Sequence, residues 1–140
     1  MTAQDCRACD GHWPAADDRI ADVGPAVAYL NADQFFAGWT IVVLKRHATE
    51  LYHLTAAERS ELIEAVTRVA SALAAVFDAV KMNYELLGNQ LPHIHWHLVP
   101  RRADDPIPRE PAWRLDHVPV ALAPGERRAR IDAIRARLAG

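Results

Sequence analysis

The stretch His93-Ile94-His95-Trp96-His97-Leu98-Val99 alternates imidazole side chains with apolar ones, and the fold of this chain can be predicted outward from it. Successive side chains of a β-strand point to opposite faces, so a strand places the three histidines on one face and the apolar side chains on the other. Ile, Trp and Val favour strands, and Pro92 and Pro100 bound the run. We therefore predict a half-buried strand over residues 93–99 with a chemically active face.

The spacing of these histidines limits the chemistry that they can perform. Residues two apart on a strand are about 6.6 Å apart and the outer pair about 13 Å, whereas zinc binds imidazole nitrogen at about 2.0–2.1 Å. One ion therefore cannot take all three from a straight strand. A row of imidazoles along an extended substrate, for nucleophilic attack and proton transfer, fits the distances better than a metal held by two adjacent histidines.

The run from His93 to Val99 resembles, at every position, the signature of the histidine triad (HIT) superfamily, His-φ-His-φ-His-φ-φ with φ apolar. The superfamily comprises nucleotide hydrolases and transferases. Three further blocks follow the family's order and extend the resemblance over about residues 5–115: Gly38 to His47, Lys81 to Tyr84, and Gly88 to Gln90. The chain is similar to bacterial HIT-domain proteins of the diadenosine polyphosphate hydrolase kind.

The resemblance implies an α+β, HIT-like fold, in which an antiparallel sheet of about five strands packs against a long helix and a C-terminal helix follows. Residues 1–140 are expected to form a single HIT domain, with its core over about 5–115 and an extension over about 116–140. Relatives usually pair as homodimers, so a homodimer is expected here.

The resemblance also implies roles for individual residues. His95, the central member of the row, is the nucleophile that forms a covalent nucleotidyl-histidine, and His97 contacts the scissile phosphate. His93 orients the site together with His47. Gln90 stands three residues before the triad, where the family usually has serine or threonine, so the proton donor for the leaving group is unassigned. Ribose or phosphate is bound by three residues: Asn83, Asn89 and Gln90.

The predicted function is a nucleotide hydrolase or nucleotidyl transferase. It cleaves a phosphoanhydride or phosphoramidate bond of a nucleoside phosphate, for example a dinucleoside polyphosphate or an AMP conjugate, and it needs no cofactor for catalysis. Two alternatives stay open. One is a non-catalytic nucleotide-binding protein, and the other is a metal-dependent hydrolase that uses His93, His95 and His97.

The pair Cys6-x-x-Cys9 has a common zinc-binding spacing. Several bacterial relatives carry such a pair and complete a zinc site with histidines equivalent to His47 and His93, so a structural zinc ion is the candidate ligand here. His12 competes as a third ligand because it is near in sequence. Free thiols on the N-terminal segment are the alternative.

Composition indicates a compact enzyme in the cytoplasm. At 140 residues the chain is long enough for one sizeable core. The longest uncharged apolar run, residues 39–44, is far short of the roughly 20 residues that span a membrane, and no secretory leader precedes it. With a formal net charge of −2, the chain lacks a broad basic surface for nucleic acid.

Elsewhere the pattern predicts strands over 26–30, 39–44 and 82–86, and a helix from the capping box at Thr55 and Glu58 to about Asp78. A final helix over 125–138 is expected to expose its five arginines. We expect Trp39 and Trp96 in the core, and Trp113 against a base or a partner. The remaining polar side chains without a motif are expected at the surface: Lys45, Arg46, His53 and His117.

Overall fold

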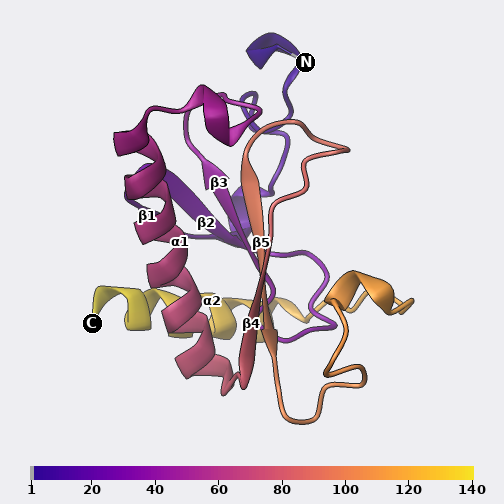
Figure 1. The fold of residues 1–140 in the computed structure, drawn as a ribbon. Coiled ribbons are helices and arrows are strands. Elements are labelled where there is room, and N and C mark those ends of the chain that lie inside the picture. The colour runs from indigo at the N-terminus through magenta and orange to yellow at the C-terminus, as the bar shows by residue number, and fades with distance from the viewer. Residues whose placement is uncertain (1) are drawn as a thin grey trace.

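The computed structural model describes residues 2–140 and confirms the predicted α+β fold, with a five-stranded antiparallel sheet, a long helix and a C-terminal helix (Figure 1). The strand order across the sheet is β1-β2-β3-β5-β4. The elements are β1 (Arg19–Val23), β2 (Ala26–Leu30), β3 (Thr40–Leu44), α1 (Ala56–Phe77), β4 (Lys81–Glu85), β5 (His95–Arg101) and α2 (Pro124–Ala139). No helix within residues 2–140 is long and apolar enough to cross a membrane.

The histidine strand lies inside the sheet, but it begins two residues later than predicted. β5 pairs with β3 on one side and β4 on the other, and it starts at His95, so His93 belongs to the preceding loop. At the other end β5 continues through Pro100. Proline is tolerated there because the ladder between β3 and β5 ends at the pair Thr40 and Leu98.

Helix α1 covers one face of the sheet, where the main hydrophobic core lies (Figure 1). The predicted capping box is present: the Glu58 backbone N–H donates to the Thr55 hydroxyl, and the Thr55 N–H donates to the Glu58 carboxylate. The buried stripe of the helix includes Leu62, Val66 and Val69. This packing leaves the opposite face of the sheet free for other groups.

A close contact between the start of β3 and the end of α1 explains the glycine before this strand. Gly38 has φ +88°, and a Cβ built there would overlap the aromatic ring of Phe77. Its N–H donates to the buried Gln34 side chain at 3.0 Å. Only glycine allows both the left-handed backbone and this approach of helix and strand.

The strand β1 is absent from the set predicted by pattern. Its sequence carries charges at positions 19 and 22, and only Ile20 and Val23 are buried, so its alternation is weak. Tertiary pairing with β2 through the tight turn at Gly24 makes it a strand. An edge strand such as β1 can therefore be missed when strands are predicted from side-chain alternation alone.

The arginines of α2 correct the expectation of a solvated face. Arg127 donates to the Leu30 and Asn31 carbonyl oxygens at 3.0 Å each, and it forms an ion pair with Asp18. Two others donate to the sheet and its loops, Arg130 to Gln34 at 2.9 Å and Arg135 to Ile20 at 2.8 Å. The helix thus attaches by directed hydrogen bonds as well as by the buried Ile131 and Ile134.

His117 and Trp39 also depart from expectation. His117 is not a surface residue: its ring stacks on Phe35, and Nε2 lies 2.6 Å from the Asp33 carboxylate. Both tryptophans are half-buried: Trp96 packs against the main core as predicted, whereas Trp39 packs against the smaller cluster on the other side of the sheet. Tertiary contacts between distant segments, not local pattern, place His117 and Trp39.

Candidate functional site

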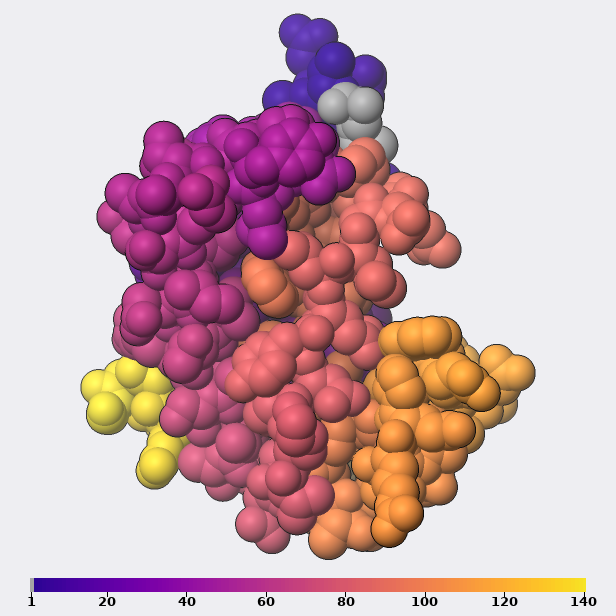
Figure 2. All heavy atoms as spheres, in the orientation of Figure 1, coloured from indigo at the N-terminus to yellow at the C-terminus, as the bar shows by residue number. Residues whose placement is uncertain are grey.

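The face of the sheet opposite α1 carries a cavity of about 730 Å³. This volume is within the usual range for a small-molecule site. His95 and His97 reach it from β5, while the loop after β4 and the segment after β5 form its sides. Figure 2 shows the surface hollowed between these two segments. The remaining lining residues are Arg7, Trp13, Asn31, Trp39, Ile41, Glu85, Leu87, Gly88, Asn89, Gln90, Leu91 and Trp113.

The surroundings of His95 determine which of its ring nitrogens carries the proton. Nδ1 lies 2.6 Å from the backbone carbonyl oxygen of His93. A carbonyl only accepts hydrogen bonds, so Nδ1 holds the proton and Nε2 holds the free lone pair. The edge of the Trp13 ring packs on His95 with centroids 5.0 Å apart. In the neutral form of the buried His95 ring, Nε2 is thus a nucleophilic nitrogen held in a fixed direction.

In the neighbouring His97 the proton lies on the other ring nitrogen. The Trp39 indole N–H, which only donates, lies 3.1 Å from His97 Nδ1. Nδ1 therefore carries no proton, and in the neutral ring the proton sits on Nε2. Burial, and next the nearby His95, lower the pKa of His97 to about 4, so the ring is neutral at pH 7. The two rings, with centroids 5.3 Å apart, thus combine a lone pair with an N–H donor.

The predicted substrate-binding residues do not all reach this cavity. Asn89 and Gln90 line it and are exposed, as a loop that meets a ligand requires. Asn83 lies elsewhere: it pairs with Val99 across the sheet, and its Oδ1 accepts from Arg101 at 2.7 Å. The register between β4 and β5 instead places Glu85 opposite His97. Asn83 therefore contributes to the buried hydrogen-bond network of Arg101.

Beside the cavity, four side chains form a compact cluster whose ligand atoms all lie within 4.8 Å of one another: Cys6, Cys9, His47 and His93. The Sγ to Nδ1 distances are 3.4 Å for Cys6 to His93, 3.4 Å for Cys9 to His47 and 3.5 Å for Cys9 to His93, and the two Nδ1 atoms are 3.2 Å apart. A tetrahedral zinc site has S–N edges of about 3.6 Å and N–N edges of about 3.3 Å. The residues present therefore fit this ion.

Hydrogen bonding prepares His93 as a ligand. Its Nε2 lies 2.7 Å from the Leu44 carbonyl oxygen, so Nε2 carries the proton and the Nδ1 lone pair faces the cluster. The backbone carbonyl of the same residue holds His95. His12, the competing ligand, is outside the cluster because its Nδ1 pairs with the Asp10 carboxylate at 2.8 Å. One residue thus joins the cluster to the cavity.

Several side chains of the site have no sequence motif. Trp39 donates a hydrogen bond to His97, and Trp13 packs against His95. Arg7, which lies between the two cysteines in the sequence, brings a positive charge to the cavity. Glu85 is the acidic residue of the wall. Alternation along residues 81–85 places Glu85 on one face with Asn83, but only the register shows which histidine it opposes.

The basic residues near the end of β3 do not line the cavity. Lys45 lies 3.7 Å from Asp22, and Arg46 donates to Glu58 at 2.9 Å. Both are at the surface, as expected, and their charges are partly compensated there. His53 is exposed, and Trp113 lines the cavity while remaining 63% exposed.

Residues 15–104 match the HIT domain family model. The chain is 27% identical over 101 residues to Protein hit of Bacillus subtilis, covering 69% of this chain and 68% of that protein. It is 28% identical over 85 residues to the asymmetrical bis(5'-nucleosyl)-tetraphosphatase of Schizosaccharomyces pombe, covering 57% of this chain and 47% of that enzyme. The second alignment therefore spans about half of the enzyme.

Solved structures show the same fold. A histidine triad protein from Bradyrhizobium japonicum superposes with a TM-score of 0.77 and 27% identity, over 87% of this chain and 92% of that one. A zinc-bound histidine triad family protein from Mycobacterium smegmatis superposes with a TM-score of 0.70 and 23% identity, over 99% and 96% of the two chains.

Proposed function

This chain belongs to the HIT family, and from that premise we propose that it cleaves a phosphoanhydride or phosphoramidate bond of a nucleoside phosphate through a covalent nucleotidyl-His95. HIT proteins form a superfamily of nucleotide hydrolases and transferases, and one relative is named as a bis(5'-nucleosyl)-tetraphosphatase. The observation that supports the covalent route most directly is the hydrogen bond between His95 Nδ1 and the His93 carbonyl. It leaves Nε2 free to attack.

The proposed first step uses both histidines of β5. The His95 Nε2 lone pair attacks the phosphorus, a P–N bond forms, and the bond to the leaving group breaks. The His97 Nε2–H donates to a non-bridging phosphate oxygen, where negative charge is stabilised by a donor that needs no reorganisation. Water then hydrolyses the P–N bond in a hydrolase, or a second acceptor takes the nucleotide in a transferase.

Mass spectrometry of a trapped intermediate tests this proposal. The protein is mixed with diadenosine polyphosphates and AMP conjugates, quenched, and digested, and the peptide that contains His95 is expected to carry an added adenylyl group. His95→Asn should abolish both adduct and turnover. His53→Asn, which alters an exposed histidine outside the cavity, is the matched control and should behave as wild type.

Two results contradict the covalent route. Binding of nucleotides without an adduct or turnover across the panel indicates a non-catalytic nucleotide-binding protein. Turnover that disappears when a metal is removed from His95 and His97, and returns with that metal, indicates a metal-dependent hydrolase.

For the cluster of Cys6, Cys9, His47 and His93 we propose a structural zinc ion, which the edge lengths of the cluster support. When bound, the ion supplies a cross-link between the N-terminal segment and the loop before β5, and no cofactor is required for the chemical step. In that role Cys6 and Cys9 hold Arg7 beside the cavity, and His93 keeps its carbonyl aimed at His95.

We also propose that two copies form a homodimer along the edge strand β4. Among residues 2–140 this strand has a partner on one side only, and the residues in and beside it that are large, apolar and exposed are Val80, Tyr84 and Leu87. Sedimentation is expected to give twice the mass of the 15.6 kDa chain. A monomer at all concentrations contradicts this proposal.

A further inference from the structure

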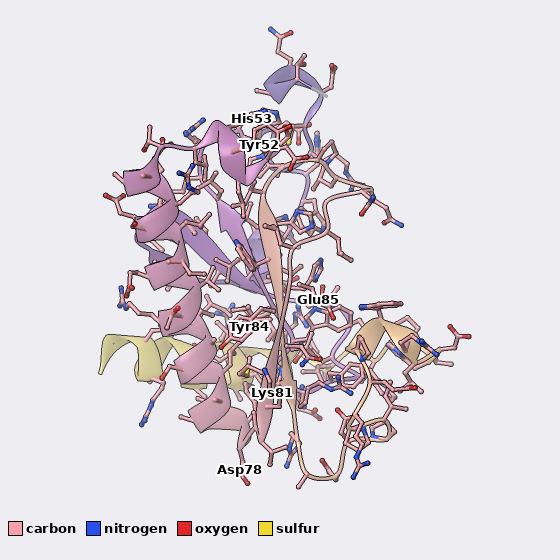
Figure 3. The ribbon with its side chains drawn as sticks, in the orientation of Figure 1. Tyr52, His53, Asp78, Lys81, Tyr84 and Glu85 are labelled. Atoms are coloured by element: carbon pink, nitrogen blue, oxygen red, sulfur yellow. The ribbon has the colours of Figure 1, made fainter. Side chains whose placement is uncertain are left out.

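A carboxylate oxygen without a partner lies in the wall of the cavity. Glu85 Oε1 is buried and has no hydrogen-bond partner among residues 2–140. Figure 3 shows this residue on β4, on the side of the sheet away from α1. The residue as a whole is half-buried, but a buried carboxylate oxygen without a partner costs free energy, which a proton or a ligand removes. Such an atom in a cavity wall therefore calls for a functional explanation.

The sheet register places this carboxyl beside the proposed catalytic pair. Glu85 pairs with His97, and residues directly opposite on neighbouring antiparallel strands have Cβ atoms about 4.5–5.5 Å apart. His95 is the next residue along β5 on the same face. Glu85 is consequently next to the imidazole that is expected to bind the phosphate.

Among the described lining residues, the Glu85 carboxyl is the group suited to give a proton to a leaving group. His97 is neutral at pH 7, and the N–H of a neutral imidazole is too weak an acid to transfer its proton to a leaving group. Arg7 keeps its proton at any physiological pH, and the amide of Gln90 does not transfer one. No hydroxyl, thiol or ammonium group is present among the described residues of the wall.

The surroundings of Glu85 favour the protonated form. Burial raises the pKa of its carboxyl above the ordinary range, and the positive charge of Arg101 opposes this rise without cancelling it. An acid with a raised pKa is protonated more often near neutral pH, as a general acid requires.

We infer that Glu85 is a catalytic residue that protonates the leaving group and then activates the hydrolytic water. The inference rests on the proposed function. As the bond from phosphorus to the leaving group breaks, the leaving atom takes the proton of the Glu85 carboxyl, which becomes a carboxylate. Water then attacks the phosphorus of nucleotidyl-His95, its proton passes to that carboxylate, and the P–N electron pair returns to His95 Nε2. Both side chains are thereby regenerated.

The test compares two AMP esters that differ only in the leaving group, p-nitrophenol and a simple alcohol. Nitrophenolate leaves without a proton, whereas an alkoxide needs one. In Glu85→Gln, the rate of the first step should fall by about 100-fold for the alkyl ester and by less than about threefold for the nitrophenyl ester. With the nitrophenyl ester the variant should also accumulate the His95 adduct, because hydrolysis of the intermediate lacks its base.

The controls separate catalysis from folding. Glu61→Gln changes an exposed glutamate on α1 and should match wild type in both assays. Thermal unfolding of Glu85→Gln should be no easier than that of wild type, because the buried Oε1 that the substitution alters has no hydrogen-bond partner among residues 2–140 to lose.

The outcomes are distinct. If Glu85→Gln slows the first step equally for both esters, or does not slow it for the alkyl ester, the role of Glu85 is overturned. The adduct on wild-type His95 would still support the proposed function. A wild-type protein that forms no adduct with either ester, nor with the diadenosine polyphosphates and AMP conjugates, overturns both.

Discussion

Trp39→Phe tests whether an indole selects the protonated nitrogen of His97. The substitution keeps an aromatic ring but removes the Nε1–H that donates to His97 Nδ1 at 3.1 Å. The partly buried Nδ1 then has no donor, and a second tautomer with the proton on Nδ1 becomes accessible. In that tautomer Nε2 bears a lone pair in place of the N–H, and it repels a phosphate oxygen.

The magnitude follows from the lost hydrogen bond. A buried acceptor without its partner costs about 1–2 kcal/mol, so the free energy of unfolding should fall by that amount. The hydrogen bond from Trp39 also favours the His97 tautomer that carries its proton on Nε2. When this stabilisation of about 1–2 kcal/mol is lost, kcat/KM should fall by about 5- to 30-fold. The pKa of His97 stays low in the variant because burial is its largest cause.

Trp96→Phe is the matched control. Trp96 is on the other face of the same sheet, and its Nε1 is buried without a hydrogen-bond partner among residues 2–140. Replacing it therefore removes a similar ring volume and no hydrogen bond.

Two measurements check the prediction. The ¹⁵N chemical shifts of the histidine rings report the tautomer of His97, and steady-state kinetics report kcat/KM. In Trp39→Phe the shifts should move toward a mixture of tautomers, while Trp96→Phe should resemble wild type in both. An unchanged His97 tautomer in Trp39→Phe, with a kcat/KM loss no larger than that of Trp96→Phe, refutes the reasoning.

Three other predictions concern the metal cluster, pH and packing. Elemental analysis should find about one zinc ion per chain, since four ligands complete a tetrahedral site. Cys9→Ser should lower that content and the Tm together, and equal zinc content in both proteins contradicts the assignment. The hydrogen bond to Asp33 raises the pKa of His117, and the pKa of Asp33 is lowered. This pair should therefore stabilise the fold fully between about pH 4 and about pH 6.5, the unfolded values of the two groups, and lose its contribution as pH rises through the folded pKa of His117. Denaturant titrations should show this loss in wild type and not in His117→Gln. Gly38→Ala should lower the free energy of unfolding by about 2–4 kcal/mol, because a left-handed backbone and overlap with Phe77 combine; an unchanged unfolding curve argues against both.

Local pattern was sufficient to predict the elements whose side chains repeat with a regular period. The alternation around His95 predicts a strand with two different faces, and the capping box at Thr55 predicts the start of α1; both features are present. Period and capping are properties of neighbouring residues, so no tertiary information is needed. The spacing of Cys6 and Cys9 likewise indicated a metal site, and the fold brings these two residues to His47 and His93.

Only the tertiary structure decided which distant residues meet. The register of β4 against β5 puts Glu85, and not Asn83, opposite His97, since a shift of two residues preserves the face of a side chain and changes its neighbour. Trp39, the residue before β3, reaches His97 on β5. Three arginines of α2 donate to carbonyl and side-chain oxygens that lie beside this helix only after folding. Alternation specifies the face on which a side chain lies, whereas its hydrogen-bond partner, and therefore its protonation, depends on contacts between distant segments.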